Sequence, residues 1–247
     1  MTLSLLRKFR SKVEQLGWVE TMRMRLIRHR LWKIYDDQLD AYRYYRWEKE
    51  EEDFDRRFNV DTCYSEDEDR IETNDSDIYF DYDPVKVSTF TKAIQSLKIR
   101  YEDFTFIDIG SGKGRALLMA TSYPFKEIIG VEMFPYFKEI AERNIADYRN
   151  AEQKCFNIKI ENFEATTYPL PEEKTVFFLF NPFNDEVLLK FLSNIKNSLS
   201  NSPREIFLIY LYPKYPEPLE NADFLTLLKE EEGYDAYTFF RIYRCKW

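Results

Sequence analysis

The segment FIDIGSGKGRALLMA, residues 106–120, decides the fold. It begins in a short apolar run, 104–109, that is typical of a buried strand, and it ends in residues typical of a helix. Glycines at 110, 112 and 114 lie between the two. Because glycine adopts positive φ angles without steric cost, such a turn lets the backbone approach a ligand closely. A glycine turn that leads from a strand into a helix therefore predicts a binding site at the helix N-terminus.

The spacing of the glycines distinguishes between ligands. A dinucleotide fingerprint, G-x-G-x-x-G, would place its third glycine at position 115, which is Arg115. The pattern is instead D-x-G-x-G-x-G, with Asp108 at the strand end. A carboxylate at that point suits a cationic amine better than a pyrophosphate, which disfavours a nucleotide-dependent oxidoreductase. The simpler role for Asp108 is that of a helix N-cap.

A second acidic residue strengthens the prediction of a ligand site. Glu132 ends the next apolar run, EIIGVE, 24 residues after Asp108 (132 − 108). An acidic side chain at the end of that strand can accept hydrogen bonds from ribose hydroxyls. Its alternative role is that of an exposed charge at a strand end. Together, the glycine turn and the two acids favour a nucleoside that carries a cationic group.

From residue 104 onward, apolar strands alternate with helical segments, which predicts a mostly parallel sheet with right-handed crossovers. We predict a Rossmann-like three-layer α/β/α domain over residues 84–247, with a seven-stranded sheet that ends in an antiparallel hairpin. The predicted strands are 104–109, 127–132, 155–160, 175–180, 205–212 and the hairpin 224–228 with 237–243. The predicted helices are 84–98, 115–121, 137–149 and 185–199.

Three segments, DIGSGKGRALLMA (108–120), IIGVEMFPYFKEIAERN (128–144) and FLFNPFNDEV (178–187), resemble the class I S-adenosylmethionine-dependent methyltransferases. The resemblance covers residues 80–215. It looks closest to a bacterial group of unidentified substrate that is distantly similar to histone lysine methyltransferases of the disruptor-of-telomeric-silencing type. The resemblance implies S-adenosyl-L-methionine as cofactor. The cofactor-binding residues that it implies are Tyr82, Asp108, Gly110, Ser111, Gly112, Gly114, Glu132, Met133, Glu164, Ala165 and Asn181.

Two of these assignments depart from the family pattern. Glu164 and Ala165 match an acid-plus-small pair that faces the adenine amine, but the family has Gly-Asp-Ala where this chain has Phe163-Glu164-Ala165. An ordinary loop charge is the alternative for Glu164. Tyr82 lies in YDPVK, which is similar to a Tyr-x-Pro-Thr segment of the family, with Val85 in place of Thr. Tyr82 is either a lid over the cofactor or a packing residue.

The tripeptide Asn181-Pro182-Phe183 directly follows the apolar run TVFFLF. Ligands of open α/β sheets bind at the carboxyl ends of the strands. The tripeptide resembles the Asn-Pro-Pro-aromatic motif of amine methyltransferases, with one proline missing. That resemblance implies that Asn181 accepts a hydrogen bond from the target nitrogen and that Phe183 packs on the substrate. An ordinary β-turn is the alternative.

Composition excludes several other functions. His29 is the only histidine, so a Ser–His–Asp or Cys–His hydrolase would depend on this one residue, and a metal site would have a single histidine ligand. The three cysteines lie far apart with no CxxC pair, so we expect no metal site and no disulfide framework. No apolar run of about 18 residues is present, and the N-terminus lacks a secretory h-region, so we expect a cytoplasmic protein without a transmembrane segment.

Residues 1–83 are predicted to be a helical, charged N-terminal extension. Residues 1–33 hold nine Lys/Arg and two Glu, a net charge of +7, whereas residues 36–83 hold six Lys/Arg and nineteen Asp/Glu, a net charge of −13. The basic part can pack on the domain, bind an anionic surface or guide an anionic substrate, and packing is the favoured interpretation. The methyl acceptor is unidentified: a protein, a small amine and a nucleic acid all stay open, as does the oligomeric state. A non-catalytic regulatory protein that binds S-adenosylmethionine is the alternative function.

Overall fold

The computed structural model describes residues 53–63, 82–231 and 239–247, which all belong to one compact unit, Glu50–Trp247. The predicted basic helix at 3–35 and the aromatic run AYRYYRW, 41–47, lie outside the described residues. Part of the predicted extension, residues 53–63, is described and includes a short helix at 53–58.

The centre of the unit is a seven-stranded sheet in the order β3-β2-β1-β4-β5-β7-β6. β1 to β5 run parallel to one another, and β7 pairs antiparallel with both β5 and β6. The strands are β1 Thr105–Ile109, β2 Glu127–Val131, β3 Ile158–Glu161, β4 Thr175–Phe180, β5 Ile206–Leu211, β6 Leu225–Glu231 and β7 Phe240–Cys245. This sheet confirms the predicted α/β fold and its closing antiparallel pair.

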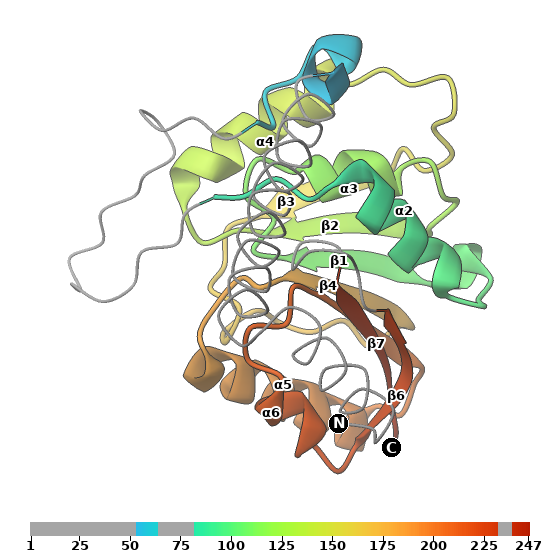
Figure 1. The fold of residues 1–247 in the computed structure, drawn as a ribbon, viewed down its shortest axis with the longest axis vertical. Helices are drawn as coiled ribbons and strands as arrows, with labels where there is room; N and C mark the ends of the chain where they lie inside the picture. The colour runs from blue at the N-terminus through green and yellow to red at the C-terminus, as the bar shows by residue number, and fades with distance from the viewer. Residues whose placement is uncertain (1–52, 64–81, 232–238) are drawn as a thin grey trace, which may run out of the picture. The chain divides into compact units, whose positions relative to one another are not determined.

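The helices cover both faces of the sheet, so the unit has three layers (Figure 1). α2, α3 and α4 lie on one side, and α5 and α6 lie on the other. Alternate residues of the central strands feed the two layers of core, since Phe106 packs with the first group and Ile107 with the second. The helices are α2 Val87–Ser96, α3 Arg115–Ala120, α4 Pro135–Asp147, α5 Asp185–Asn201 and α6 Glu217–Glu220, with a 3-10 turn at Tyr101–Asp103.

The order of the strands creates a switch point. From β1 the chain winds outward through β2 and β3, and it then returns to β4 on the opposite side of β1. The crossovers that leave β1 and β4 therefore depart on opposite faces, which opens a crevice between the carboxyl ends of these two strands. The glycine turn follows β1, and Asn181 follows β4.

Two predicted boundaries are wrong for physical reasons. Pro84 does not open a helix, because Lys86 is still extended at φ −63° and ψ 132° and α2 begins at Val87. The third strand begins at Ile158 rather than at residue 155, because Cys155 instead donates its backbone N–H to Thr121 at the end of α3. Within the described ranges, no helix combines the length and apolar character needed to cross a bilayer.

Candidate functional site

A cavity of about 400 Å³ opens at the carboxyl ends of β1, β2 and β4. Its size falls within the range of small-ligand sites in proteins. Of the residues singled out from the sequence, those that line it are Tyr82, Asp108, Gly110, Ser111, Gly112, Glu132, Met133, Glu164, Ala165, Asn181, Pro182 and Phe183. Asp108 and Glu132 thus face the same hollow from neighbouring strands.

The glycine turn needs glycine because of its backbone angles and its neighbours. Gly110 and Gly112 have φ angles of 78° and 51°, which side-chain-bearing residues rarely adopt. A Cβ on Gly110 would lie 2.6 Å from the Cβ of Pro182, and a Cβ on Gly112 would lie 2.4 Å from the ring of Tyr82. The turn after β1 is therefore in close contact with both the turn after β4 and Tyr82.

Gly114 does not line the cavity. It is the N-cap of α3 with a φ of 85°, and a Cβ there would lie 3.2 Å from the Cβ of Ala141 in α4. Its position permits the turn and the close packing of α4 against it. It also replaces Asp108 as the N-cap, so the simpler role considered for Asp108 does not apply.

Asp108 is a buried carboxylate that faces the cavity with 4% of its surface exposed. Burial, and then the nearby charge of Glu132, raise the pKa of Asp108 well above its ordinary value. Among the described residues, no hydrogen bond or ion pair reaches this carboxylate. A buried carboxylate without a partner is costly, so a cation in the cavity would relieve it.

Glu132 is equally buried but is held in place by the backbone. Its two carboxylate oxygens accept hydrogen bonds from the N–H of Gly112 at 2.8 Å and of Phe134 at 2.9 Å. Burial raises its pKa, and these backbone hydrogen bonds oppose that rise. Each oxygen keeps a further lone pair, so the carboxylate can still accept hydrogen bonds from two hydroxyl groups of a ligand.

The far end of the cavity is more exposed. Met133 is 49% exposed and Phe163 39% exposed, although both line the cavity. Asn162 fixes the backbone there, because its Nδ2 donates to the carbonyls of Glu132 at 2.7 Å and Met133 at 2.9 Å. Glu164 accepts a hydrogen bond from the Thr166 hydroxyl at 2.6 Å. The surface between these groups suits a flat, partly apolar ring with a polar edge.

The turn after β4 brings a carboxamide to the cavity. Asn181 has a φ of 42°, and its Oδ1 accepts a hydrogen bond from the Tyr210 hydroxyl at 3.2 Å. Phe183 is 7% exposed and packs against Phe191 at a ring separation of 6.0 Å, so most of its ring belongs to the core. Asn184 then caps α5 by accepting the Val187 N–H at 3.0 Å.

Sequence reasoning missed several lining residues. Those that contribute to the cavity beyond the predicted ones include Val85, Arg115, Val131, Phe134, Phe163, Phe180, Asn184 and Tyr212. Phe134 and Phe163 could have been found, because Phe134 lies two positions after Glu132 and Phe163 directly precedes Glu164, and both acids were predicted to face the ligand. Tyr212, at φ 49°, directly follows β5, for which the sequence offered no site motif.

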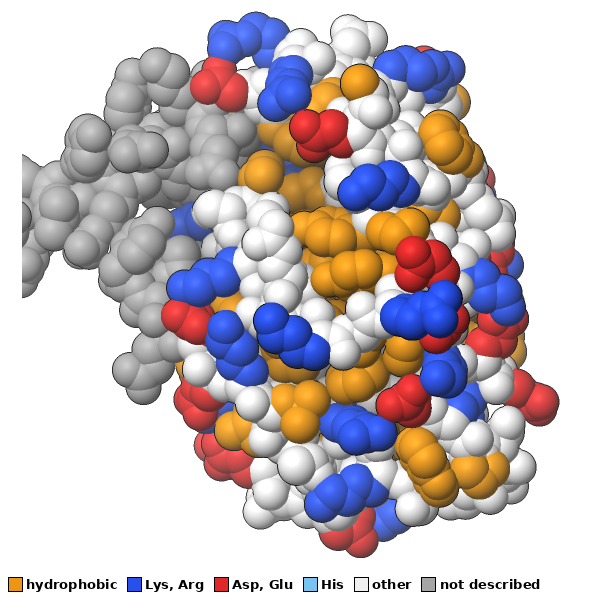
Figure 2. Space-filling model, turned by 90° about the vertical axis from the view of Figure 1, so that its right-hand side faces the viewer, with side chains coloured by type: hydrophobic (Ala, Val, Ile, Leu, Met, Phe, Trp, Pro, Cys, Tyr) orange, Lys and Arg blue, Asp and Glu red, His pale blue; other side chains and the backbone are white. Residues whose placement is uncertain are grey.

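A second hollow lies on the face shown in Figure 2, where apolar side chains gather among Lys and Arg side chains. It measures about 540 Å³ and is lined by residues of the segment after α2 and of β5 to β7. Glu205 pairs there with Lys174 at 2.8 Å and with Arg244 at 2.9 Å, and Lys229 pairs with Glu231 at 3.2 Å. Nothing here resembles the buried, partner-free carboxylate of the first cavity. Over the residues that the structure describes, no cluster of His, Cys, Asp and Glu could hold a metal ion.

No protein-family profile matches the chain, and no curated protein matches its sequence. Solved structures that resemble it include an RNA methyltransferase from Salinibacter ruber in complex with S-adenosyl-L-homocysteine, at a TM-score of 0.43 and 11% identity over 66% of this chain and 92% of that one. A putative methyltransferase from Escherichia coli has a TM-score of 0.46 and 17% identity over 65% and 87% of the two chains. A SAM-dependent methyltransferase from Aquifex aeolicus has a TM-score of 0.45 and 16% identity over 65% and 97%. At such low TM-scores the likeness carries no functional argument.

Proposed function

We propose that the protein is an S-adenosylmethionine-dependent methyltransferase that methylates a nitrogen of an amine-bearing acceptor. The observation that carries the proposal is the meeting of Asp108, Glu132 and Asn181 in one cavity at the switch point of the sheet. A partner-free buried carboxylate, a backbone-held carboxylate and a carboxamide thus face a single ligand-sized space.

The residues of the cavity fit the cofactor group by group. Asp108 would pair with the α-amino group of the methionine part, which supplies the cation that this carboxylate lacks. Ser111, whose buried Oγ has no hydrogen-bond partner within the described part of the chain, lies beside the same part of the ligand. Glu132 would accept hydrogen bonds from the ribose hydroxyls. Met133, Glu164 and Ala165 would face the adenine.

When bound, the cofactor supplies a methyl group on a sulfonium, which is already activated for transfer. The protein's own task is then to position the acceptor nitrogen and to exclude water. Asn181 Oδ1 keeps one lone pair beyond its bond to Tyr210, and that lone pair would accept an N–H of the acceptor and point the nitrogen lone pair at the methyl group. We assign no general base, because the proton of the product can leave to solvent.

The charge of the cavity supports an amine as the acceptor. Its lining includes the acidic residues Asp83, Asp108, Glu132 and Glu164, whereas Arg115 is the only basic residue that the described part of the chain contributes to it. Arg115 is ion-paired with Asp55 at 3.2 Å, so its charge is already matched. Such a lining disfavours an anionic phosphate ester at the point of transfer and supports an acceptor that reacts as a neutral amine, because only the neutral form has the lone pair that attacks the methyl group.

Isothermal titration of the purified protein with S-adenosylmethionine, S-adenosylhomocysteine and NAD tests the first half of the proposal. We expect binding of the first two and none of NAD, with binding lost in Asp108→Ala. Absence of S-adenosylmethionine binding in the wild-type protein would overturn the proposal.

Incubation of a cell lysate with methyl-labelled cofactor tests the second half, by finding the fraction that becomes labelled in the presence of the protein. Cofactor binding without label in any fraction would instead favour the non-catalytic regulatory protein.

A further inference from the structure

The glycine turn carries two cations that are almost completely buried. The side chains of Lys113 and Arg115 are each 1% exposed. Burying a charged side chain is unfavourable unless other groups pair with it and satisfy its hydrogen bonds. The cofactor acids do not serve this purpose, because Asp108 has no partner among the described residues and Glu132 bonds to the backbone.

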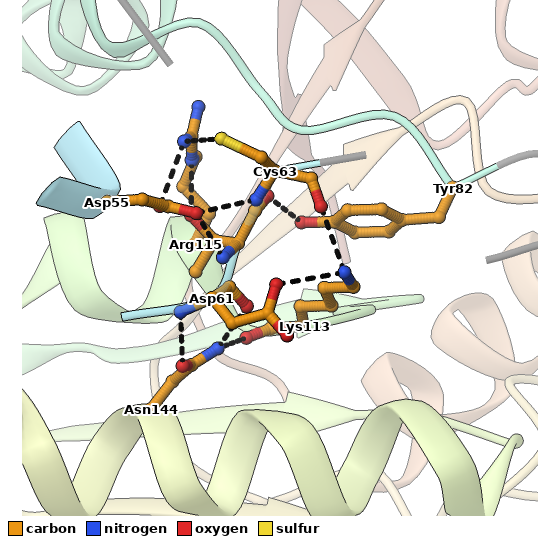
Figure 3. A network of polar contacts seen from close by, with 8 residues as sticks. Asp55, Asp61, Cys63, Tyr82, Lys113, Arg115 and Asn144 are labelled. Carbon is orange, nitrogen blue, oxygen red and sulfur yellow. Dashed lines mark hydrogen bonds and ion pairs between the residues drawn. The ribbon is translucent and has the colours of Figure 1, made fainter. Parts of the chain in front are cut away.

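Groups that match both cations come from residues 55–63, which we call the clasp (Figure 3). Lys113 Nζ donates to Asp61 Oδ1 at 3.0 Å and to the carbonyl of Cys63 at 2.9 Å. Arg115 donates through Nε to the Thr62 hydroxyl at 2.7 Å and through a terminal nitrogen to Asp55 Oδ1 at 3.2 Å. Asp61 is half exposed, so we expect the buried Asp55 pair to be the stronger of the two.

The clasp has a defined shape because Asp55 also organises its own turn. The helix at 53–58 ends at Asn59, which has a φ of 54° and turns the chain back. Asp55 Oδ2 then accepts the backbone N–H groups of Thr62 at 2.5 Å and Cys63 at 2.7 Å. The carboxylate that pairs with Arg115 therefore also fixes the residues that bind the two cations.

α4 holds the clasp and the glycine turn together through one side chain. Asn144 is buried, and its Nδ2 donates to the carbonyls of Asp61 at 2.7 Å and Lys113 at 2.9 Å. Its Oδ1 accepts the Asp61 N–H at 2.8 Å. Aromatic packing adds to this, since the ring centroids of Phe58 and Tyr148 are 4.9 Å apart.

The clasp also places Tyr82 over the turn. The Tyr82 hydroxyl donates to the carbonyl of Thr62 at 2.8 Å, and its ring lies so close to Gly112 that no side chain fits there. The N–H of Gly112 is in turn a hydrogen-bond donor to Glu132, at 2.8 Å. A continuous set of contacts thus runs from the clasp, through the glycine turn, to the carboxylate proposed to hold the ribose.

We propose that the clasp is an integral part of the cofactor site, and that Asp55 and Asp61 are positioning residues that preorganise the glycine turn by compensating Lys113 and Arg115. The proposal rests on the proposed function only for the identity of the ligand. Without the clasp, Lys113 and Arg115 would lose these ion pairs and hydrogen bonds, and Tyr82 would lose its hydrogen bond to Thr62. The turn would then sample open conformations that cannot bind the cofactor.

The test compares Asp55→Ala with Asp53→Ala in the full chain. Asp53 lies on the same helix, is 48% exposed and pairs with Arg56 at the surface, so its loss leaves the clasp intact. For Asp55→Ala we expect the dissociation constant of S-adenosylmethionine to rise by about tenfold or more, measured by titration calorimetry. We expect Asp53→Ala to match the wild type.

Hydrogen exchange of the ligand-free protein gives a readout that does not depend on the cofactor. In Asp55→Ala, the amides of residues 110–114 should exchange faster than in the wild type. If exchange were faster in Asp55→Ala but the wild-type protein did not bind S-adenosylmethionine, the proposed function would be wrong. The role of the clasp in ordering the glycine turn would still be supported. If Asp55→Ala changed neither the exchange rates of residues 110–114 nor the affinity for S-adenosylmethionine, the proposed role of the clasp would be wrong.

Two further variants keep the test decisive if Asp55→Ala does not fold. Tyr82→Phe removes the hydroxyl that bonds to Thr62, and we expect a weaker cofactor affinity with a melting temperature lowered by only about 2–4 °C. The double variant Asp55→Leu with Arg115→Met removes both members of this ion pair at once, and it should fold more stably than Asp55→Ala because no buried guanidinium remains that has lost its bond to Asp55. Wild-type affinity in Tyr82→Phe, with equal stability of the single and double variants, would count against the proposal.

Discussion

The hydroxyl of Tyr210, in the middle of the sheet, donates a hydrogen bond to Oδ1 of Asn181 across 3.2 Å. Tyr210 is fully buried on β5, and burial raises its pKa, so the hydroxyl stays protonated and acts as a donor. Asn181 sits on the neighbouring strand end with a strained φ of 42°. The bond therefore fixes which way the carboxamide points, and with it the lone pair offered to an acceptor nitrogen.

We predict that Tyr210→Phe lowers turnover without changing cofactor affinity. The loss of one neutral hydrogen bond corresponds to about 1 kcal/mol, which is a fall in kcat of roughly fivefold if the bond matters in the transition state. The measurement is the initial rate of methyl transfer to the labelled acceptor fraction, beside a calorimetric titration with S-adenosylmethionine.

Tyr101→Phe is the matched control for this prediction. Its hydroxyl also donates one hydrogen bond, to the carbonyl of Ile94 at 2.9 Å, but it lies away from the cavity. Turnover should not change in Tyr101→Phe. An equal loss of turnover in both variants would mean that the sheet, rather than Asn181, is affected.

Gly110→Ala is expected to destabilise the protein and to prevent cofactor binding. Alanine at a φ of 78° costs about 1–2 kcal/mol, and overlap with Pro182 at 2.6 Å adds about 1–3 kcal/mol. Urea unfolding of the ligand-free protein measures the sum. The double variant Gly110→Ala with Pro182→Gly should regain the stability lost to the overlap but not the stability lost to backbone strain. Full recovery of the stability would show that the left-handed conformation is not required.

Asp108→Asn should stabilise the ligand-free protein at neutral pH while it removes cofactor binding. Because the folded pKa of Asp108 is raised, the folded state binds the proton more tightly than the unfolded chain. Stability therefore falls as the pH rises from the ordinary value of 3.8 through the raised value. The asparagine variant does not lose stability in this way. The difference in the free energy of unfolding between Asp108→Asn and the wild type should therefore appear in urea unfolding at pH 7 and shrink toward pH 4.

The same carboxyl makes cofactor binding dependent on pH. The amine of the cofactor pairs only with the ionised form of Asp108, so affinity should rise with pH through the raised pKa, and binding should release a proton below it. Titration calorimetry in two buffers with different ionisation enthalpies measures that proton. Equal heats in both buffers, over the pH range in which affinity changes, would contradict the assignment of Asp108.

The sequence predicts the central sheet well because its strands are apolar runs bounded by breakers. TVFFLF, for example, becomes β4 at the expected residues, Thr175–Phe180. The four-residue helix α6, Glu217–Glu220, was not predicted, because it is too short for a periodic pattern and contains a proline. The helical start expected at Pro84 failed because Lys86 is still extended and Val85 is buried against the cavity.

The cavity residues could be predicted for a similar reason, since a strand–glycine turn–helix unit fixes where its own side chains go. The clasp could not, because Asp55 and Arg115 are separated by 60 positions and no local pattern joins them. In the sequence, Arg115 indicated only that the third glycine of a dinucleotide-binding fingerprint is missing. Two indications were available: a buried glycine turn with two cations requires partners, and Phe54 and Phe58 form an apolar i, i+4 pair beside Asp55 and Asp61.

Replacement of Asn181 by alanine and by glycine separates its two roles. Both variants lack the carboxamide, so both should bind S-adenosylmethionine and lose turnover. They should differ in stability, because glycine adopts a φ of 42° without strain whereas alanine costs about 1 kcal/mol. Urea unfolding measures that difference, and the labelled acceptor measures turnover. If Asn181→Gly kept wild-type turnover, the residue would serve only to turn the chain after β4, and the acceptor nitrogen would have to be held by another group of the cavity.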